Sequence, residues 1–239
     1  MRAILVSVDY ADILSITLPY NRHHFDEVLV VTVPDDPSIQ IALQNNCYVL
    51  TTNSFYDDGA VFNKWKALEQ GLDAFVRHGW ICVMDADFLW PKEITLNLDI
   101  GNLYTPLLRM APLKLPIPAE IDWHKFPVHR NTTEWAGYSQ IFNANDPHLG
   151  DPPWHETNWR HAGGADSMFQ LKWPLTHKKR PPWEVLHLGE CGVNWCGRSS
   201  PYLDGTEHPR SRTRFSMLRE FIKRRKIGPK RFDGEKLTP

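Results

Sequence analysis

Four apolar residues lead into two acids in the stretch Ile81-Cys82-Val83-Met84-Asp85-Ala86-Asp87. The apolar run predicts a buried parallel strand, and the two acids then lie at its carboxyl end. Ligands of open α/β sheets bind outside the carboxyl ends of the strands. Two neighbouring carboxylates repel each other unless a cation or a hydroxyl-rich ligand lies between them. The stretch therefore predicts a site for Mg²⁺ or Mn²⁺ carrying phosphates, because both ions prefer carboxylate oxygen.

Strand and helix signals alternate on the N-terminal side of this stretch. Runs rich in β-branched residues predict strands over 3–8 and 28–33, and a shorter strand is expected over 48–51. Helices are expected over 38–46 and over 61–76, where apolar residues recur at helical spacing. This order predicts an α/β fold with a Rossmann-like, mostly parallel central sheet and helices on both faces.

The texture of the chain changes between residues 111 and 183. Prolines and tryptophans become dense there, and regular elements are expected only over 137–144 (a strand) and 165–173 (a short helix). Aromatic side chains in such a segment often line a cleft, where they stack on sugars or bases. The alternative interpretation is that these tryptophans simply fill the core.

Basic residues concentrate near the C-terminus. Segment 210–231 has ten Lys or Arg and a single acid, so its charge is +9, whereas the whole chain carries -1. A basic segment on an acidic body indicates an anionic partner such as nucleic acid or a membrane surface. The alternative is an amphipathic helix packed on the acidic body, with its cations in solvent. Candidate nucleic-acid contacts are Arg219, Lys223, Arg224 and Arg225.

Composition limits the compartment. No run approaches the roughly 20 apolar residues that span a bilayer. The four cysteines are scattered and suggest no disulfide framework. A reducing cytoplasm is therefore the expected location.

Three later residues add chemistry to the two acids. A short strand over 184–188 carries His187, whose imidazole can complete a metal site begun by carboxylates. Arg198 is a cation able to neutralise a diphosphate leaving group. Asp166 follows paired glycines at a helix start, where it can face a ligand or serve as a plain N-cap.

In this order the pieces resemble nucleotide-sugar-dependent glycosyltransferases of the GT-A fold, through most of the chain. The matching segments are Asp9-Tyr10-Ala11-Asp12 after the opening strand, Phe62-Asn63-Lys64 at a helix start, Asp85-Ala86-Asp87, Asp166 and His187. The resemblance implies a metal-dependent, hexosyltransferase-like enzyme. Such an enzyme moves a sugar from a nucleotide diphosphate sugar, by default a UDP-sugar, to an acceptor hydroxyl.

The resemblance also implies residue roles. The ligands of a divalent cation, Mn²⁺ or Mg²⁺, would be Asp85, Asp87 and His187. The residues along the nucleotide-sugar would be Val8, Asp9, Tyr10, Lys64, Asp85 and, by inference from its charge, Arg198. The acceptor or donor-sugar pocket would be lined by Gln140, Gly164 and Trp195. Asp166 would be the catalytic base of an inverting reaction, or would orient the acceptor in a retaining one.

The implied organisation is a GT-A domain over 1–209, followed by a basic helix and tail over 210–239. Within the domain, residues 1–110 form the nucleotide-binding half and residues 111–209 the acceptor half. The +9 segment makes a hydroxylated or hydroxymethylated base in DNA the predicted acceptor, since such a base must leave its stack and its phosphates must be neutralised. A glycan or a small metabolite is the alternative acceptor.

Three other functions compete with this interpretation. A zinc site could use His187, Cys191 and Cys196, although no fourth ligand is evident. A nucleotidyltransferase acting on sugar phosphates would carry a Gly-rich basic signature after the first strand, which this sequence lacks. A nucleic-acid-binding module with a degenerate catalytic core would be favoured by loss of Asp87 or His187, and both are present.

Overall fold

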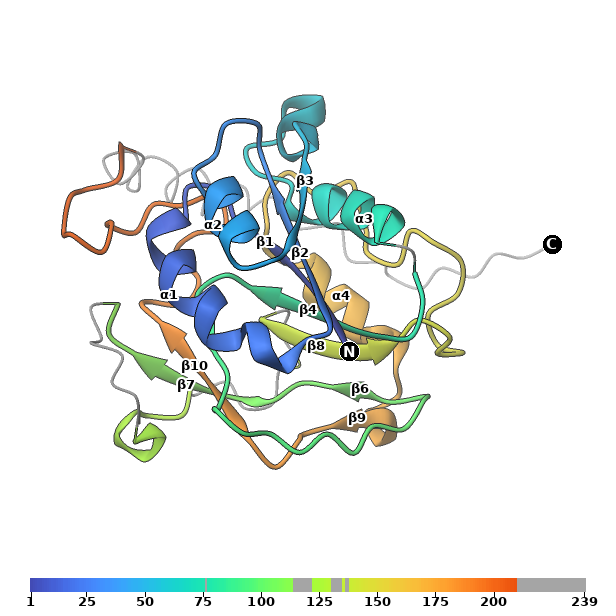
Figure 1. Ribbon diagram of the computed structural model, residues 1–239. Coiled ribbons are helices and arrows are strands. Elements are labelled where there is room, and N and C mark those ends of the chain that lie inside the picture. Colours follow the sequence, from blue (N-terminus) through green and yellow to red (C-terminus); the bar gives the residue numbers. More distant parts are fainter. Residues whose placement is uncertain (76, 114–121, 130–134, 136–137, 210–239) are drawn as a thin grey trace, which may run out of the picture.

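Two sheets organise the computed structural model, which describes residues 1–75, 77–113, 122–129, 135 and 138–209 (Figure 1). The larger sheet has the order β3-β2-β1-β4-β8-β6-β9 and the smaller one β5-β10-β7. The strands of the larger sheet are β1 (Arg2–Val6), β2 (Glu27–Thr32), β3 (Tyr48–Thr51), β4 (Trp80–Asp85), β6 (Leu103–Tyr104), β8 (Ser139–Asn143) and β9 (Lys178–Lys179). Those of the smaller sheet are β5 (Phe88–Leu89), β7 (Leu107–Ala111) and β10 (Glu184–Leu188).

Helices and short 3₁₀ turns connect these strands. The α-helices are α1 (Ala11–Asn21), α2 (Ser38–Gln44), α3 (Lys64–Ala74) and α4 (Ala165–Phe169). The 3₁₀ turns are η1 (Arg22–His24), η2 (Ser54–Gly59), η3 (Trp123–Lys125), η4 (Gln170–Lys172) and η5 (Leu175–His177). The expected helix over 165–173 is thus α-helical only in its first part.

The predicted α/β fold with a mostly parallel central sheet is confirmed. Strand β1 pairs in parallel with β2 on one side and with β4 on the other, and β3 pairs in parallel with β2. Beyond β4 the direction changes, because β8 pairs antiparallel with both β4 and β6. The strand that delivers the two acids is therefore parallel to one neighbour and antiparallel to the other.

Helices cover both faces of the sheet, as predicted (Figure 1). Alternate β1 residues point to opposite faces: Ile4 packs in a cluster with Trp65 of α3, and Leu5 in a cluster with Leu14 of α1. Helix α3 lies close to the strands at Gly71, where a Cβ would be 2.6 Å from Cδ1 of Ile4. A larger side chain there would push the helix away from the sheet.

Both predicted halves contribute to one sheet and one core. Strands β8 and β9 come from residues 111–209, and Phe142 and Trp154 share a buried cluster with Trp65. For Trp154, Trp173 and Trp183, which are at most 7% exposed, the core interpretation is confirmed. The domain boundaries stay a prediction, and the basic helix with Arg219, Lys223, Arg224 and Arg225 lies outside the described residues.

Within the described part of the chain, no helix is both long and apolar enough to cross a membrane. The four cysteines are free thiols, two of them buried. The compartment inferred from them stays a prediction.

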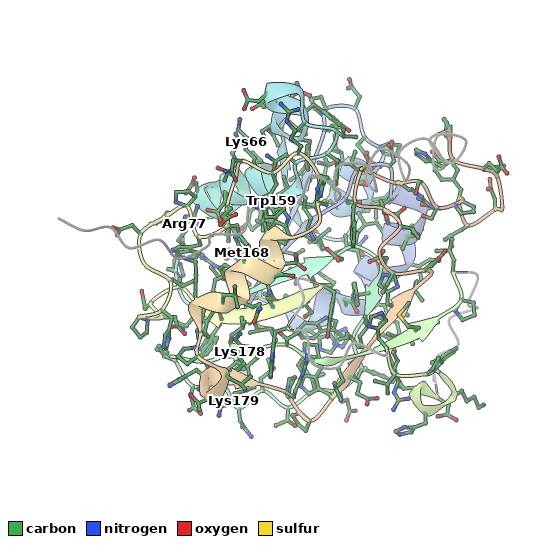
Figure 2. The ribbon with its side chains drawn as sticks, turned by 180° about the vertical axis from the view of Figure 1, so that it is seen from behind. Lys66, Arg77, Trp159, Met168, Lys178 and Lys179 are labelled. Atoms are coloured by element: carbon green, nitrogen blue, oxygen red, sulfur yellow. The ribbon has the colours of Figure 1, made fainter. Side chains whose placement is uncertain are left out.

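A buried carboxylate ties α3 to the loop that follows β8. Glu69 is 4% exposed and accepts hydrogen bonds from the backbone N–H groups of Trp154 (3.0 Å) and His155 (2.9 Å). It also pairs with Nδ1 of His155 (2.6 Å) and with Arg77, which lies just beyond α3 (Figure 2). The pKa of Glu69 is below its usual value. Burial raises it, but the hydrogen bonds from His155 and the charge of Arg77 lower it by more than burial raises it.

The Glu69→Gln substitution is expected to lower the free energy of unfolding by about 3 kcal/mol, because it leaves Arg77 without its buried partner. Chemical denaturation at neutral pH measures this loss. The matched control is Asp73→Asn, which removes the exposed i,i+4 partner of the same arginine and is expected to cost about 0.5 kcal/mol or less. Equal losses in the two variants would contradict the assignment.

The same carboxylate predicts a pH dependence. Its pKa is lowered in the folded state, so its contribution to stability is complete above the unfolded value of about 4.3 and is lost as the pH falls through the folded pKa. On acidification through this range, wild-type protein is expected to lose more stability than Glu69→Gln.

Candidate active site

Helix α1 fixes the turn that carries the two acids. Oγ1 of Thr17 donates to the carbonyl oxygen of Ala86 (2.6 Å), between Asp85 and Asp87. Nδ2 of Asn21 donates to the carbonyl oxygen of Phe88 (2.6 Å). Thr17 and Asn21 are both buried, so the turn after β4 is held by polar contacts from inside the core. No sequence motif points to either residue.

Asp87 and His187 lie together, as the resemblance implies. Nε2 of His187 is 3.6 Å from Oδ2 of Asp87, and the Leu188 N–H donates to the Asp87 carbonyl oxygen (2.9 Å). The smaller sheet produces this contact. Strand β5, which directly follows the acids, pairs with β10, and Phe88 lies opposite His187. Burial lowers the pKa of His187, but the charge of Asp87, the Cys191 thiol and Asp85 together raise it, to about 9.

One oxygen of Asp87 has an unusual environment. Asp87 is 8% exposed, and its Oδ1 atom is buried without a hydrogen-bond partner among the described residues. A buried carboxylate oxygen in this state is costly unless a cation or a donor approaches it. The atom belongs to the same carboxylate whose Oδ2 faces His187.

Asp85 has a different partner. It is the last residue of β4, and its carboxylate pairs with the ammonium of Lys64, the first residue of α3. Burial raises the pKa of Asp85 above its usual value; Lys64 lowers it and the nearby Asp87 raises it again. Lys64 is 8% exposed and was expected to meet the nucleotide or its phosphates, yet here it binds an acid predicted to be a metal ligand.

The predicted metal ligands are therefore near one another but not assembled. Among the described residues, no three His, Cys, Asp or Glu side chains form a group that could hold a metal ion as they stand. Asp85, Asp87 and His187 do not form such a group, and Asp85 is paired with Lys64. The residues of the alternative zinc site, His187, Cys191 and Cys196, do not form such a group either.

The loop after β1 is tightly anchored. Val8 is buried, and Asp9 adopts a left-handed φ of 62°. The Asp9 N–H donates to Oδ2 of Asp36 (2.8 Å), whose Oδ1 accepts from the Ser38 N–H (2.8 Å) at the start of α2. This anchoring role of Asp36 is not predicted from the sequence. Its Pro-Asp-Asp-Pro context predicts a turn, and the signal for its role is that aspartates in turns accept hydrogen bonds from backbone N–H groups.

Tyr10 connects this loop to the acids. Burial, then the charges of Asp87 and Asp85, raise its pKa well above the usual tyrosine value, while Arg198 lowers it. The loop that carries Tyr10 begins beside these carboxylates, because Val6 is the register partner of Asp85 in the β1–β4 pair.

The expectation that Arg198 binds the diphosphate is wrong. Arg198 is completely buried and forms a two-pronged ion pair with Asp12 of α1. Its remaining N–H groups donate to backbone carbonyl oxygens, so no donor is left for a phosphate. The sequence shows the positive charge of Arg198 but not the acid that neutralises it, which lies 186 positions earlier.

The glycine pair before Asp166 accommodates two tryptophans. A Cβ on Gly163 would lie 3.0 Å from Cδ2 of Trp195, and one on Gly164 would lie 2.6 Å from the ring of Trp159. Trp159 lies close to α4 in Figure 2. Gly164 also has a φ of 108°, which a side chain would strain.

Around Asp166 the predicted pocket residues differ in exposure. Trp195 is 41% exposed and Asp166 is half-buried, whereas Gln140 is fully buried. Nε2 of Gln140 donates to the carbonyl oxygens of Trp135 (3.0 Å) and Asp166 (3.4 Å). Its Oε1 is buried and has no hydrogen-bond partner within the described segments. Gln140 therefore contacts the backbone of the predicted catalytic residue.

No family model matches the sequence, and no curated protein matches it. Among solved structures, the chain is similar to the inositol-1-phosphate CTP transferase from T. maritima, at 9% identity, over 80% of this chain and 89% of that one, with a TM-score of 0.46. It is also similar to a putative glucose-1-phosphate thymidylyltransferase from Bacillus anthracis, at 8% identity, over 77% and 88%, with a TM-score of 0.42.

A third similar structure is glucosyl-3-phosphoglycerate synthase from Mycobacterium tuberculosis in complex with Mn²⁺, UDP and phosphoglyceric acid. It is 20% identical over 45% of this chain and 43% of the synthase, with a TM-score of 0.32. The chain spans a similar share, 41%, of a mycobacterial protein that it also matches. At TM-scores below 0.5 these similarities assign no function, so the function is argued from the side chains of the site.

Proposed function

We propose that the chain is a metal-dependent glycosyltransferase that uses a nucleotide diphosphate sugar, with UDP as the nucleotide. The observation that carries the proposal is the buried Oδ1 of Asp87, which no donor among the described residues satisfies, in a carboxylate 3.6 Å from His187. It lies at the carboxyl end of β4, where α/β sheets bind their ligands.

The donor set supports a divalent cation. Asp87 and His187 offer oxygen and nitrogen ligands, and Asp85 adds a second carboxylate once Lys64 releases it. Carboxylate oxygens with one imidazole suit Mn²⁺ or Mg²⁺. A cation bound there would stabilise the charge that develops on a diphosphate leaving group.

The chain's own residues would complete the reaction site. Lys64 is already desolvated beside Asp85, so its ammonium is placed to pair with a donor phosphate when Asp85 turns to the cation. Val8, Asp9 and Tyr10 would contact the nucleoside. Asp166 would remove the proton of the attacking hydroxyl if the reaction inverts, or orient the acceptor if it retains.

The pocket for the transferred sugar and the acceptor would be formed by Gln140, Gly164 and Trp195. Oε1 of Gln140, which has no partner in the part of the chain that the structure describes, is a hydrogen-bond acceptor suited to a hydroxyl group. The partly exposed indole of Trp195 offers a surface on which a sugar or a base can stack.

The first prediction from this proposal concerns the cation. Mn²⁺ together with UDP is expected to raise the melting temperature of wild-type protein, and Asp87→Asn is expected to abolish that increase, because an amide carries no charge for the cation. A thermal-shift titration of Mn²⁺ at fixed UDP measures it. In a chelator, wild-type protein is expected to lose donor hydrolysis by at least about 100-fold.

The matched control is Asp151→Asn, which changes an exposed aspartate elsewhere and is expected to behave as wild type. Full donor hydrolysis by Asp87→Asn in the presence of a chelator would disprove the mechanism.

The acceptor gives a separate prediction. We propose a hydroxyl on a nucleic-acid base, supported by the +9 charge of segment 210–231. Replacing Arg219, Lys223, Arg224 and Arg225 with Gln is expected to weaken DNA binding and to reduce the salt dependence of the binding constant by up to about four units of slope. Hydrolysis of the donor by water is expected to be unchanged. Unaltered DNA binding by this variant would leave a glycan or a small metabolite as the acceptor.

A further inference from the structure

Arg198 is a buried cation whose role the proposed reaction leaves unexplained. Its Nε donates to the carbonyl oxygen of Ser200 (3.3 Å), and Nη2 donates to that of Pro201 (2.7 Å) and to Oδ2 of Asp12 (2.8 Å). Its Nη1 donates to Oδ1 of Asp12 and to the carbonyl oxygen of Asp9 (2.7 Å). Every N–H of the guanidinium is therefore used, and a planar five-donor fork is required to make all these contacts.

The surroundings of the guanidinium hold it rigidly. The rings of Tyr10 and Tyr202 lie 5.0 Å and 4.6 Å from its central carbon, within cation–π range. The Leu203 N–H donates to Oδ2 of Asp12 (2.8 Å), so the same carboxylate also binds the segment that follows Arg198. Removing the Asp12 carboxylate would leave the Arg198 charge buried without its ion-pair partner.

What this arrangement controls is the backbone of Asp9. The Asp9 N–H is held by Asp36 and its carbonyl oxygen by Arg198, one bond on each side of a left-handed residue. The left-handed region is sterically less favourable for an L-residue, although aspartate adopts it more readily than most, and the contacts on both sides of Asp9 help to hold it there. The next residue, Tyr10, packs on the guanidinium, and the loop that carries it begins beside the acids, because Val6 is the register partner of Asp85.

We propose that Arg198, together with Asp12, is a positioning residue for the donor nucleoside. It locks Asp9 and Tyr10 in the conformation that receives the nucleoside and does not touch the diphosphate. The proposal rests on the proposed function, since it needs a nucleotide at this loop.

The test variant is Arg198→Lys, which keeps the charge but offers three donors in place of the fork. The Kd for UDP with Mn²⁺, measured by calorimetry, is expected to rise about tenfold or more, as displacement of a binding loop commonly causes. The kcat for donor hydrolysis at saturation is expected to stay within about twofold, because no group at the reacting bond has changed.

Uridine separates positioning from direct phosphate contact. A displaced nucleoside loop weakens uridine and UDP by the same factor, whereas loss of a diphosphate ligand weakens UDP alone. Uridine binding to wild-type and variant protein is measured by NMR titration. A loss confined to UDP would overturn the proposal.

The matched control is Arg109→Lys. Arg109 also forms a two-pronged ion pair, with Glu184, and it also donates to a backbone carbonyl oxygen. The variant is expected to lose stability without a change in UDP affinity. Asp12→Asn keeps the side-chain volume and is expected to reproduce the effect of Arg198→Lys. It replaces Arg198→Lys as the test variant if that protein does not fold. Melting curves fix a temperature at which every variant is folded.

The outcomes are distinct. UDP affinity unchanged in Arg198→Lys and Asp12→Asn, or weakened equally in Arg109→Lys, overturns the positioning role and leaves the proposed function intact. Absence of UDP binding by wild-type protein in Mn²⁺ overturns the proposed function itself.

Discussion

Two hydrogen bonds from α1 to the turn after β4 determine where the acids lie. Thr17 and Asn21 present polar groups from the buried face of a helix, and they bind the carbonyl oxygens on either side of Asp87. Strand β4 delivers the acids to the edge of the sheet, and these contacts fix the turn that follows. Because β5 then pairs with β10, the same turn brings Asp87 to His187, which lies 100 residues later in the sequence.

The charges around this turn are balanced as the structure stands. Asp85 is neutralised by Lys64, and Asp87 faces a histidine whose pKa of about 9 favours the protonated form at neutral pH. Without these partners the two neighbouring carboxylates would repel each other. A divalent cation entering this site would displace the imidazole proton, since only the neutral ring is a ligand. The positive charge it adds is matched by the negative charge of the diphosphate that would accompany it.

The sequence predicts the elements whose signals are local. Strand β3 occupies the predicted residues 48–51, and β10 occupies the predicted residues 184–188. Strand β4 contains the apolar run that leads into Asp85. Helix α1 escapes prediction, because Pro19 lies within it and two of the residues on its buried face are polar. Those polar residues are the ones that bind the turn after β4. A pattern of apolar residues alone cannot reveal a helix whose inner face does this.

The two basic residues assigned to the diphosphate show where sequence reasoning ends. Lys64 and Arg198 both have a motif context and a positive charge, and nothing in the local sequence separates them. The fold separates them by their partners. Among the described residues, Lys64 has one carboxylate partner, which it can exchange for a phosphate, and its ammonium needs no fixed geometry. Arg198 has two charged bonds and three backbone bonds, and all of them would have to break before it could meet a ligand. A buried cation with every donor engaged can shape a binding loop, but it cannot follow a substrate. For this reason Lys64, and not Arg198, is the cation that we propose to meet the donor.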